Sequence, residues 1–420
     1  MASPLRSTSM LWAQVGSLAL VQGAISLTWV IYNLYLVKLL TGLGFPQAWA
    51  AGLLVVENLL AIVMEPLMGT FSDRRQHDLG TRFPMIALGV ILAAGLFFLI
   101  PTALVWGQHG LLRWLLPLLL VAWALAMTIF RSPALSLLGR YAFRTQLPQA
   151  ASVLTLVGGL AGAMGPFSSQ WILSLGAGVA FGAGSVVLLG AMAVLGWVGP
   201  NQTITPPENS PGDAPRAPSV PSGVSLLHLA LVFGAGVGVT LGFRLMMTTF
   251  PIVLKQQVAN ASVPTTMGMI FLALALTALP AGSLATRLGN RRAMVVGLAL
   301  LVLLTAGMLT IQTPGLGTAI ALLFGGAFSL VANGTIPFAL QMVPPTKAGL
   351  GTGMYFSGGA LALSLWGFFL GSPSLPPQSS ALLAALAFLG AGLCVGIAQP
   401  KRYGGGQPPD PGYRRSRGRD

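Results

Sequence analysis

Charged residues are scarce in this sequence. Lys, Arg, Asp and Glu together make up only 7% of its 420 residues, whereas 54% of the residues are hydrophobic. Because a water-soluble domain carries about a quarter charged residues, so few charges could not cover the surface of a soluble fold. The shortage therefore argues against a soluble nucleic-acid-binding protein, despite the net charge of +14. It indicates a protein that crosses a membrane many times.

Cysteine and histidine are rare as well. Cys394 is the single cysteine and lies in an apolar run, which excludes a disulfide framework and a metal site built on several thiolates. The three histidines, His77, His109 and His228, are scattered, and the chain contains neither HExxH nor Gly-x-Ser-x-Gly. An intramembrane enzyme is thus left without support. We expect no enzymatic activity, no cofactor and no resident metal.

Long apolar runs predict an all-α protein with twelve membrane-spanning helices, because about 20 apolar residues cross a bilayer as a helix. We expect the spans at about 12–37, 47–71, 83–101, 114–138, 149–172, 177–198, 225–254, 264–285, 293–311, 316–342, 348–371 and 379–398. Residues 201–224 are rich in Pro, Ser and Gly, which predicts a flexible linker. It separates an N-terminal half at 1–200 from a C-terminal half at 225–400, and a disordered basic tail follows at 401–420.

The distribution of Lys and Arg predicts the orientation of these spans. If the N-terminus is inside, the outer loops contain only Lys38, Arg113 and Lys255, and most other basic residues lie in cytoplasmic loops and the tail. Multi-pass proteins carry this excess on the cytoplasmic side. We therefore expect a monomer embedded in the lipid bilayer of the cell (inner) membrane, with both termini in the cytoplasm.

The two halves repeat each other at corresponding loops. The pattern Gly-x3-Asp-Arg begins at Gly69 between spans two and three. A related pattern, Gly-x3-Thr-Arg, begins at Gly282 between spans eight and nine, where Arg287 and Arg291 also lie. Two parallel six-helix halves around a central cavity are typical of secondary transporters, which bind their substrate near the middle of the membrane.

The loop after span two resembles the signature loop of the major facilitator superfamily, Gly-x3-Asp-Arg-x-Gly-Arg-Arg. In full, the loop consists of Ser-Asp-Arg at 72–74, five further residues, and Gly-Thr-Arg-Phe-Pro at 80–84. This longer pattern resembles that of the sucrose transporters and of the glycoside–pentoside–hexuronide group of sugar–cation symporters. The superfamily resemblance covers the whole chain through span count, linker and repeated loop. It implies the twelve-helix fold and transport by alternating access. The symporter resemblance rests on this loop alone, and Thr286 departs from the pattern because it replaces the acid of the second copy.

These loops form a predicted gate on the cytoplasmic side. A glycine lets two helices approach closely, and an aspartate at a helix end can pair with an arginine or with the N-terminus of a neighbouring helix. Such a pair can form in one conformation and break in another. The alternative is that the charges only anchor the loop in the cytosol. The predicted gate residues are Gly69, Asp73, Arg74, Gly80, Arg82, Arg287 and Arg291.

Two acids and two arginines fall inside the predicted spans: Glu57 and Glu65 on span two, Arg131 on span four and Arg244 on span seven. An ionisable side chain at such a depth costs at least ~2.5 kcal/mol unless it is paired or hydrated, so each is a functional candidate. Counted at about 1.5 Å per residue, Glu65 lies level with Arg131, and Glu57 lies level with Arg244. We predict these two pairs and assign all four residues to cation coupling or substrate binding. Permanent pairs that only stabilise packing are the alternative.

Aromatic and amide side chains inside the spans are the further candidates for a substrate site. Aromatic rings stack on sugars, and amides supply both a donor and an acceptor. An aromatic belt at the membrane interface is the alternative for the residues of span one. The candidates are Trp29, Tyr32 and Asn33 on span one, Asn333 and Gln341 on span ten, and Tyr355 on span eleven.

These observations favour a secondary active transporter of a small solute, coupled to a proton or sodium ion and of the sugar-symporter type. A proton-coupled exporter of amphipathic compounds is the second interpretation, because the C-terminal half offers few polar groups. A membrane sensor built on the same scaffold is the third, because fold does not fix function. The sequence alone leaves these alternatives open.

Overall fold

The computed structural model describes residues 10–106, 110–204, 223–258, 262–370 and 375–399. Most of the predicted linker and the whole predicted tail, 401–420, lie outside the described residues. The regular structure of the described part is helical. One isolated antiparallel bridge joins Met10 to Ala142.

Twelve long helices form this described part. The first six are α1 (Trp12–Gly42), α2 (Ala48–Leu79), α3 (Phe83–Leu99), α5 (Leu115–Ser136), α7 (Leu147–Ser174) and α8 (Ala177–Val198). The last six are α9 (Leu226–Gln257), α10 (Val263–Leu288), α11 (Asn290–Gly307), α12 (Pro314–Gln341), α13 (Ala348–Leu365) and α14 (Pro377–Ile397). Short turns join them: η1 (Ile100–Thr102), α4 (Ala103–Trp106), η2 (Gly110–Trp114), α6 (Leu138–Tyr141), η3 (Met308–Thr310), η4 (Pro345–Lys347) and the π-turn η5 (Trp366–Leu370).

The predicted number of spans is confirmed, and α13 shows why one of them is unusual. Eleven helical segments of the described chain are long and apolar enough to cross a membrane. The remaining long helix, α13, is rich in glycine and packs between α2 and α9. Small residues are typical where a helix packs closely on other helices rather than on lipid.

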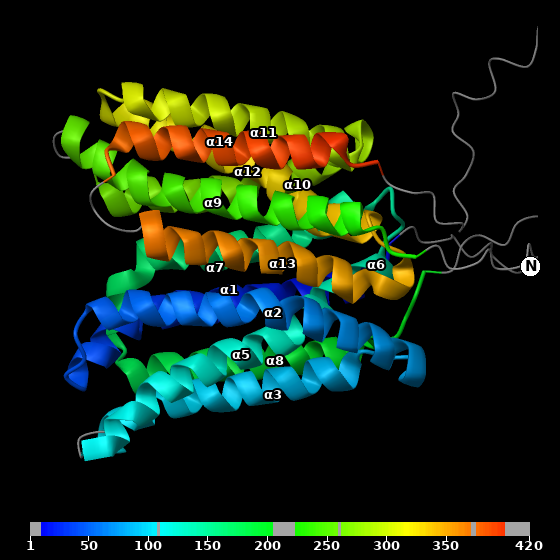
Figure 1. Cartoon of the computed structure of the whole chain (residues 1–420), viewed down its shortest axis with the longest axis horizontal. Coiled ribbons are helices and arrows are strands. Elements are labelled where there is room, and N and C mark those ends of the chain that lie inside the picture. The colour runs from blue at the N-terminus through cyan, green and yellow to red at the C-terminus, as the bar shows by residue number, and fades with distance from the viewer. Residues whose placement is uncertain (1–9, 107–109, 205–222, 259–261, 371–374, 400–420) are drawn as a thin grey trace, which may run out of the picture.

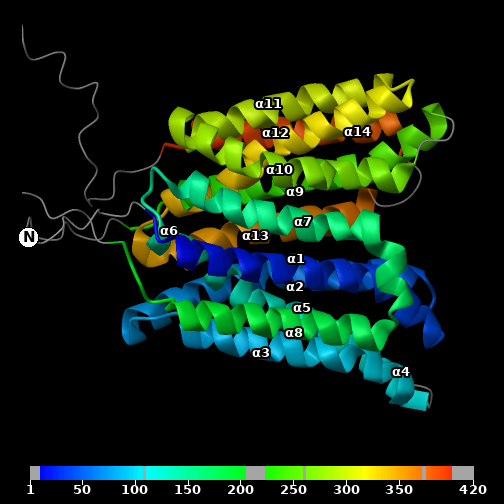
Figure 2. The same ribbon diagram turned by 180° about the vertical axis from the view of Figure 1, so that it is seen from behind.

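The long helices lie side by side, and the first six and the last six each surround a core of their own (Figures 1 and 2). Trp123 and Phe97 lie in the first core, and Phe324 and Phe388 lie in the second. The most extensive packing between the two groups is that of α2 against α13 and of α7 against α10, and α7 also packs against α12 and α5 against α13. A cavity between the two groups must therefore lie beside these helix contacts.

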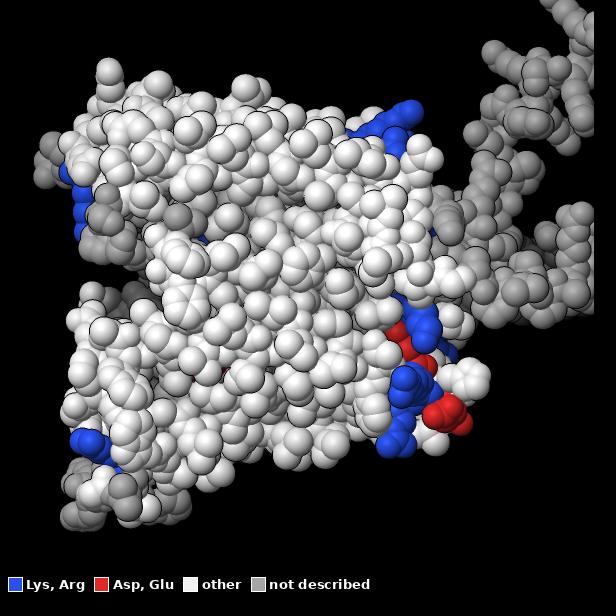
Figure 3. Space-filling model, in the orientation of Figure 1, with Lys and Arg blue, Asp and Glu red and all other residues white. Residues whose placement is uncertain are grey.

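The start of α1 and the end of α14 lie at the same end of the bundle, which we call the termini end (Figure 1). The opposite end, where α1 is followed by α2, is called the far end. Charged side chains gather at the termini end, and the body of the molecule between the two ends is almost free of surface charge on the face shown in Figure 3. This distribution is the one expected of a bundle that crosses a bilayer.

Helix α2 is longer than the sequence predicted. We expected span two to end near residue 71, but the helix continues through Leu79 and ends at Gly80, whose φ of 70° is left-handed. Most of the predicted loop is therefore helix, and only 80–82 connect α2 to α3. Hydropathy marks the end of the apolar segment, whereas the polar residues that follow continue the helix beyond it.

Candidate functional site

A cavity of about 760 Å³ lies between α1, α2, α5, α9 and α13. Its lining reaches Val37 and Gln47 beside the connection of α1 to α2, so it extends toward the far end. Figure 3 shows a notch at that end of the molecule. Most lining residues are apolar, and the ionisable ones are Glu57, Arg131 and Arg244. All three were among the predicted site residues.

Glu57 lies in the wall of the cavity and is held from behind. Its Oε1 accepts a hydrogen bond from the hydroxyl of Tyr32, which stacks on Trp123 with 4.6 Å between ring centroids. The other oxygen, Oε2, is buried and has no hydrogen-bond partner among the described residues. Only 5% of the residue is exposed. Glu57 thus has one oxygen fixed by the protein and one that is buried without a hydrogen-bond partner among the described residues.

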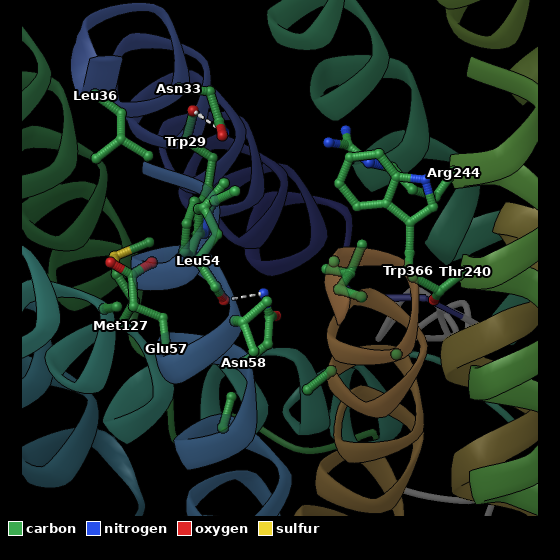
Figure 4. A pocket seen from close by; sticks show the side chains of 18 of the residues that line it. Trp29, Asn33, Leu36, Leu54, Glu57, Asn58, Met127, Thr240, Arg244 and Trp366 are labelled. Atoms are coloured by element: carbon green, nitrogen blue, oxygen red, sulfur yellow. Dashed lines mark hydrogen bonds between the residues drawn. The ribbon is translucent and has the colours of Figure 1, made fainter. Parts of the chain in front are cut away.

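Arg244 lies on the opposite side of the cavity from Glu57 (Figure 4). Its guanidinium lies over the ring of Trp366, 4.1 Å from the centroid. No acid of the described residues forms a salt bridge with it, and its buried Nε has no hydrogen-bond partner there. The predicted Glu57–Arg244 pair is therefore wrong. Counting residues placed the two side chains at one level, but it could not show that a cavity separates them.

The predicted Glu65–Arg131 pair is confirmed. Arg131 Nε donates to Glu65 Oε1 at 2.9 Å, and Nη2 bonds to the same oxygen. Glu65 is fully buried, and Arg131 reaches the cavity with its guanidinium 4.5 Å from the ring centroid of Phe356. The positive charge of Arg131 is therefore compensated by Glu65, whereas no acid of the described residues compensates that of Arg244.

The structure divides the predicted substrate-lining residues into two groups. Trp29 and Asn33 line the cavity, and Tyr32 lies just outside it, behind Glu57. The three candidates from the last six helices do not line it. Asn333 donates to the carbonyl of Ala278, Gln341 donates to the carbonyl of Arg144, and Tyr355 is buried in the second core. Residue type alone could not show which face of α12 or α13 meets the cavity.

Sequence reasoning missed several residues that line the cavity. Asn58 follows Glu57 and donates its amide to the carbonyl of Leu54 at 2.7 Å. Phe356 is the direct neighbour of the predicted Tyr355, and Thr240 faces the cavity one helical turn before Arg244. Two of them could have been found from the sequence, because Asn58 adjoins Glu57 and Thr240 lies one helical turn from Arg244, and both of those charged residues lie inside predicted spans. Trp366 gave no such signal, because a π-turn has no recognisable sequence pattern.

Asp73 is the centre of a cluster that joins α2 to α13 at the termini end. Its Oδ1 accepts from Arg82 at 2.5 Å and from the backbone N–H of Gly349 at 2.9 Å, and its Oδ2 accepts from the N–H of Leu350 at 2.9 Å. Arg82 also donates to Ser136. Burial lowers the pKa of Arg82 from its usual value, and the Asp73 carboxylate opposes this shift. The carboxylate thus binds an arginine and also caps the positive N-terminus of α13.

The other predicted gate residues do not contact Asp73. Arg74 and Arg287 are exposed, Gly80 ends α2, and Arg291 donates to the carbonyl of Ala398 at 2.9 Å. Gly69 does take part, because it lets α2 and α13 approach: a Cβ at Gly69 would collide with the carbonyl oxygen of Gly349. The observed cluster therefore contains Gly69, Asp73 and Arg82 of the seven predicted residues.

Gly69→Ala is expected to prevent closure of the termini end, because the new methyl group would occupy the position of the Gly349 backbone. Spin labels at Arg75→Cys and Arg292→Cys, in a Cys394→Ala background, report the separation of the two six-helix groups at this end. We expect a longer distance in Gly69→Ala. Gly52→Ala on the same helix has open space around it and should leave the distance unchanged. An unchanged distance in Gly69→Ala would contradict the close approach.

Comparison with known proteins identifies the family. The model of the Major Facilitator Superfamily matches residues 18–367, which is most of the chain. The chain belongs to the Major Facilitator Superfamily. It is a secondary transporter and not an enzyme, and it takes a small molecule as substrate. The match establishes the superfamily but gives no evidence for the sugar–cation symporter subgroup that the loop resembles.

Two solved structures share this fold. The crystal structure of the human organic anion transporter MFSD10 (TETRAN) aligns with a TM-score of 0.64 and 16% identity, covering 94% of this chain and 100% of that chain. FucP, a transporter of the same superfamily in the outward conformation, aligns with a TM-score of 0.63 and 13% identity, covering 92% and 100%. At such identities the likeness shows the fold alone.

Proposed function

We propose that this transporter carries an amphipathic organic anion together with a proton. The observation that carries the proposal is Arg244, which faces a mainly apolar cavity without an acid partner in the described chain. A buried charge without a counter-charge is costly, and a negatively charged group of the substrate would compensate it. Arg131 offers no equivalent site because Glu65 already neutralises it.

The rest of the lining supports an amphipathic substrate. Trp29, Phe356, Trp366 and Met127 give the cavity large apolar surfaces. A few polar groups placed among such surfaces are typical of sites that orient a small organic ligand. The likeness in fold to MFSD10, whose structure is described as that of an organic anion transporter, agrees with an anionic substrate.

Glu57 supports coupling to a proton. A carboxylate in the wall of the cavity repels an anion bound at Arg244, and protonation of Glu57 removes this repulsion. Anion and proton therefore bind better together than apart, which is the condition for symport. The free Oε2 of Glu57 is the position where the proton would bind.

The gate and the orientation complete the proposal. The distribution of basic residues supports a cytoplasmic termini end. In this orientation the cavity would face outward, and the Asp73 cluster would close the cytoplasmic side. Rocking of the six-helix groups would break this cluster and expose the cavity to the cytoplasm. Proposed domain boundaries follow the same division, with the first half at 1–200, the linker at 201–224 and the second half at 225–400.

Arg244→Gln tests the anion site. Purified protein in liposomes is assayed for uptake of radiolabelled octanesulfonate, which stays charged and does not leak across the bilayer as a neutral acid. Loss of a charge-assisted hydrogen bond costs about 1.5–3 kcal/mol, so we expect a fall in kcat/KM of about 10- to 150-fold. Arg75→Gln is the matched control, because Arg75 also lies over an aromatic ring, that of Phe71, but is exposed at the termini end. Equal uptake by Arg244→Gln and wild type would overturn the proposal.

A cation-coupled sugar transporter is the second candidate. Trp29, Asn33, Asn58 and Glu57 lie together on one side of the cavity, and this set of ring, amides and carboxylate suits a sugar. The same liposomes are tested with a panel of sugars while current is recorded. Sugar-evoked current that disappears in Glu57→Gln, with no octanesulfonate uptake, would favour this candidate. Silence with every substrate would favour a sensor.

A further inference from the structure

Both arginines of the cavity lie against an aromatic ring from the same part of the chain. Phe356 of α13 covers Arg131, and Trp366 of the following π-turn covers Arg244. The two arginines differ in whether their charge is free to bind a ligand. Arg131 is hydrogen-bonded to Glu65, whereas Arg244 has no acid partner in the described chain. Arg244 and Trp366 therefore form a composite surface in which one cationic group and one large ring are both exposed to the cavity.

The π-turn fixes the position of Trp366. Trp366 is its first residue, and Gly367 follows it directly against α2, where an added Cβ would lie 2.5 Å from Val55 Cγ2. Gly367 thus lets the turn of the second group approach the first group at the wall of the cavity. Wide turns of this kind occur often at functional sites because they change the direction in which side chains point.

A ligand anion that accepts hydrogen bonds from Arg244 approaches along the edge of the guanidinium, because the N–H groups point outward in its plane and the indole covers one face. The atoms next to the anionic group then lie beside Trp366, and Trp29 faces the same space from the other side (Figure 4). A flat aromatic ring can stack on such surfaces, whereas a puckered aliphatic ring of the same size gains contact area without the favourable ring geometry.

We propose that Trp366 makes the cavity selective for aromatic over aliphatic organic anions. This inference rests on the proposed anion transport and names its substrate class. Aromatic pairs gain about 0.5–1.5 kcal/mol beyond their buried area, which corresponds to a preference of about 2- to 12-fold. Trp366 is a specificity-determining residue in this account, and Arg244 supplies the attraction common to both kinds of anion.

The test compares benzenesulfonate with cyclohexanesulfonate, which share charge and approximate size. Uptake into liposomes gives the ratio of kcat/KM for the two probes. We expect several-fold preference for benzenesulfonate in wild type, a ratio near one in Trp366→Leu, and a retained preference in Trp366→Phe. Trp197→Leu is the matched control, because Trp197 is 89% exposed on α8 and should leave the ratio unchanged.

The outcomes separate this inference from the proposed function. Equal uptake of the two probes by wild type, or an unchanged ratio in Trp366→Leu, overturns the role of Trp366 while anion transport stands. If wild type takes up octanesulfonate but neither ring probe, this inference is overturned and anion transport stands. If wild type takes up none of the three anions, the anion transport itself is overturned. If Trp366→Leu does not yield folded protein, Trp366→Met has a longer, unbranched and more flexible side chain that can fill the space of the indole differently, and it carries the same expected ratio near one.

Discussion

Asp73→Asn is expected to open the termini end. The carboxylate binds Arg82 and two backbone N–H groups of α13, and these contacts are buried except for the partly buried one to Leu350. Arg82 belongs to the same six-helix group as Asp73, so only the bonds to the N–H groups of Gly349 and Leu350 hold α2 to α13. Asn is uncharged and has one acceptor oxygen, so it loses one of these bonds, and a hydrogen bond to a charged group is worth about 1.5–3 kcal/mol. Because this cost falls only on the conformation in which α2 and α13 are together, the equilibrium should move by about 10- to 150-fold toward the open termini end.

Distances between spin labels at Arg75→Cys and Arg292→Cys, again in a Cys394→Ala background, measure this change. We expect mainly the short distance in the parent protein and mainly a longer one after Asp73→Asn. Asp78→Asn is the matched control, because Asp78 is an exposed acid on the same helix whose one described salt bridge is with His77 at 3.1 Å. An unchanged distribution in Asp73→Asn would show that the cluster does not hold the two groups together.

Hydropathy and glycine placement explain why the fold could be predicted. The expected span at 177–198 coincides with α8 (Ala177–Val198), because apolar residues continue to both ends and glycines flank the helix. The same method failed for α2, where Asp73 and its polar neighbours belong to the helix but not to its apolar segment. Apolar length therefore indicates where a helix lies in the membrane, and it does not show where the helix ends.

The sequence predicted how deep in the membrane each charged residue lies, but it did not predict toward which neighbouring helix the side chain points. Glu65 and Arg131 were placed at one level and do form a pair. Glu57 and Arg244 were placed at one level and lie on facing sides of a cavity. The partner of Glu57 is Tyr32, which the sequence analysis assigned to the substrate. Predicting this contact would have required the tilt of α1 against α2, which depends on packing throughout the first core.

Glu57→Gln is expected to abolish proton-driven accumulation while leaving exchange of the anion intact. The amide has nearly the same shape, and its oxygen can still accept from Tyr32, so the wall of the cavity should be preserved. The amide cannot take up a proton, so the bound anion no longer brings one with it. In the proposed symport, an outside that is one pH unit more acidic drives about tenfold accumulation of the anion. The variant should reach only the equilibrium concentration.

Two measurements in the same liposomes distinguish loss of coupling from loss of folding. Uptake of octanesulfonate against its gradient, with the outside made acidic, should disappear in Glu57→Gln. Counterflow, in which unlabelled anion inside exchanges for labelled anion outside without a pH gradient, should continue at a rate near that of wild type. Glu57→Asp keeps a group that binds a proton and should retain part of the accumulation. If Glu57→Gln accumulates the anion at the wild-type level, the proton binds at another residue. If the variant loses both counterflow and accumulation, Glu57 takes part in binding the substrate. Glu57 has one oxygen fixed by Tyr32 and one without a partner among the described residues. Proton coupling requires a group that titrates at this position, whereas substrate binding does not.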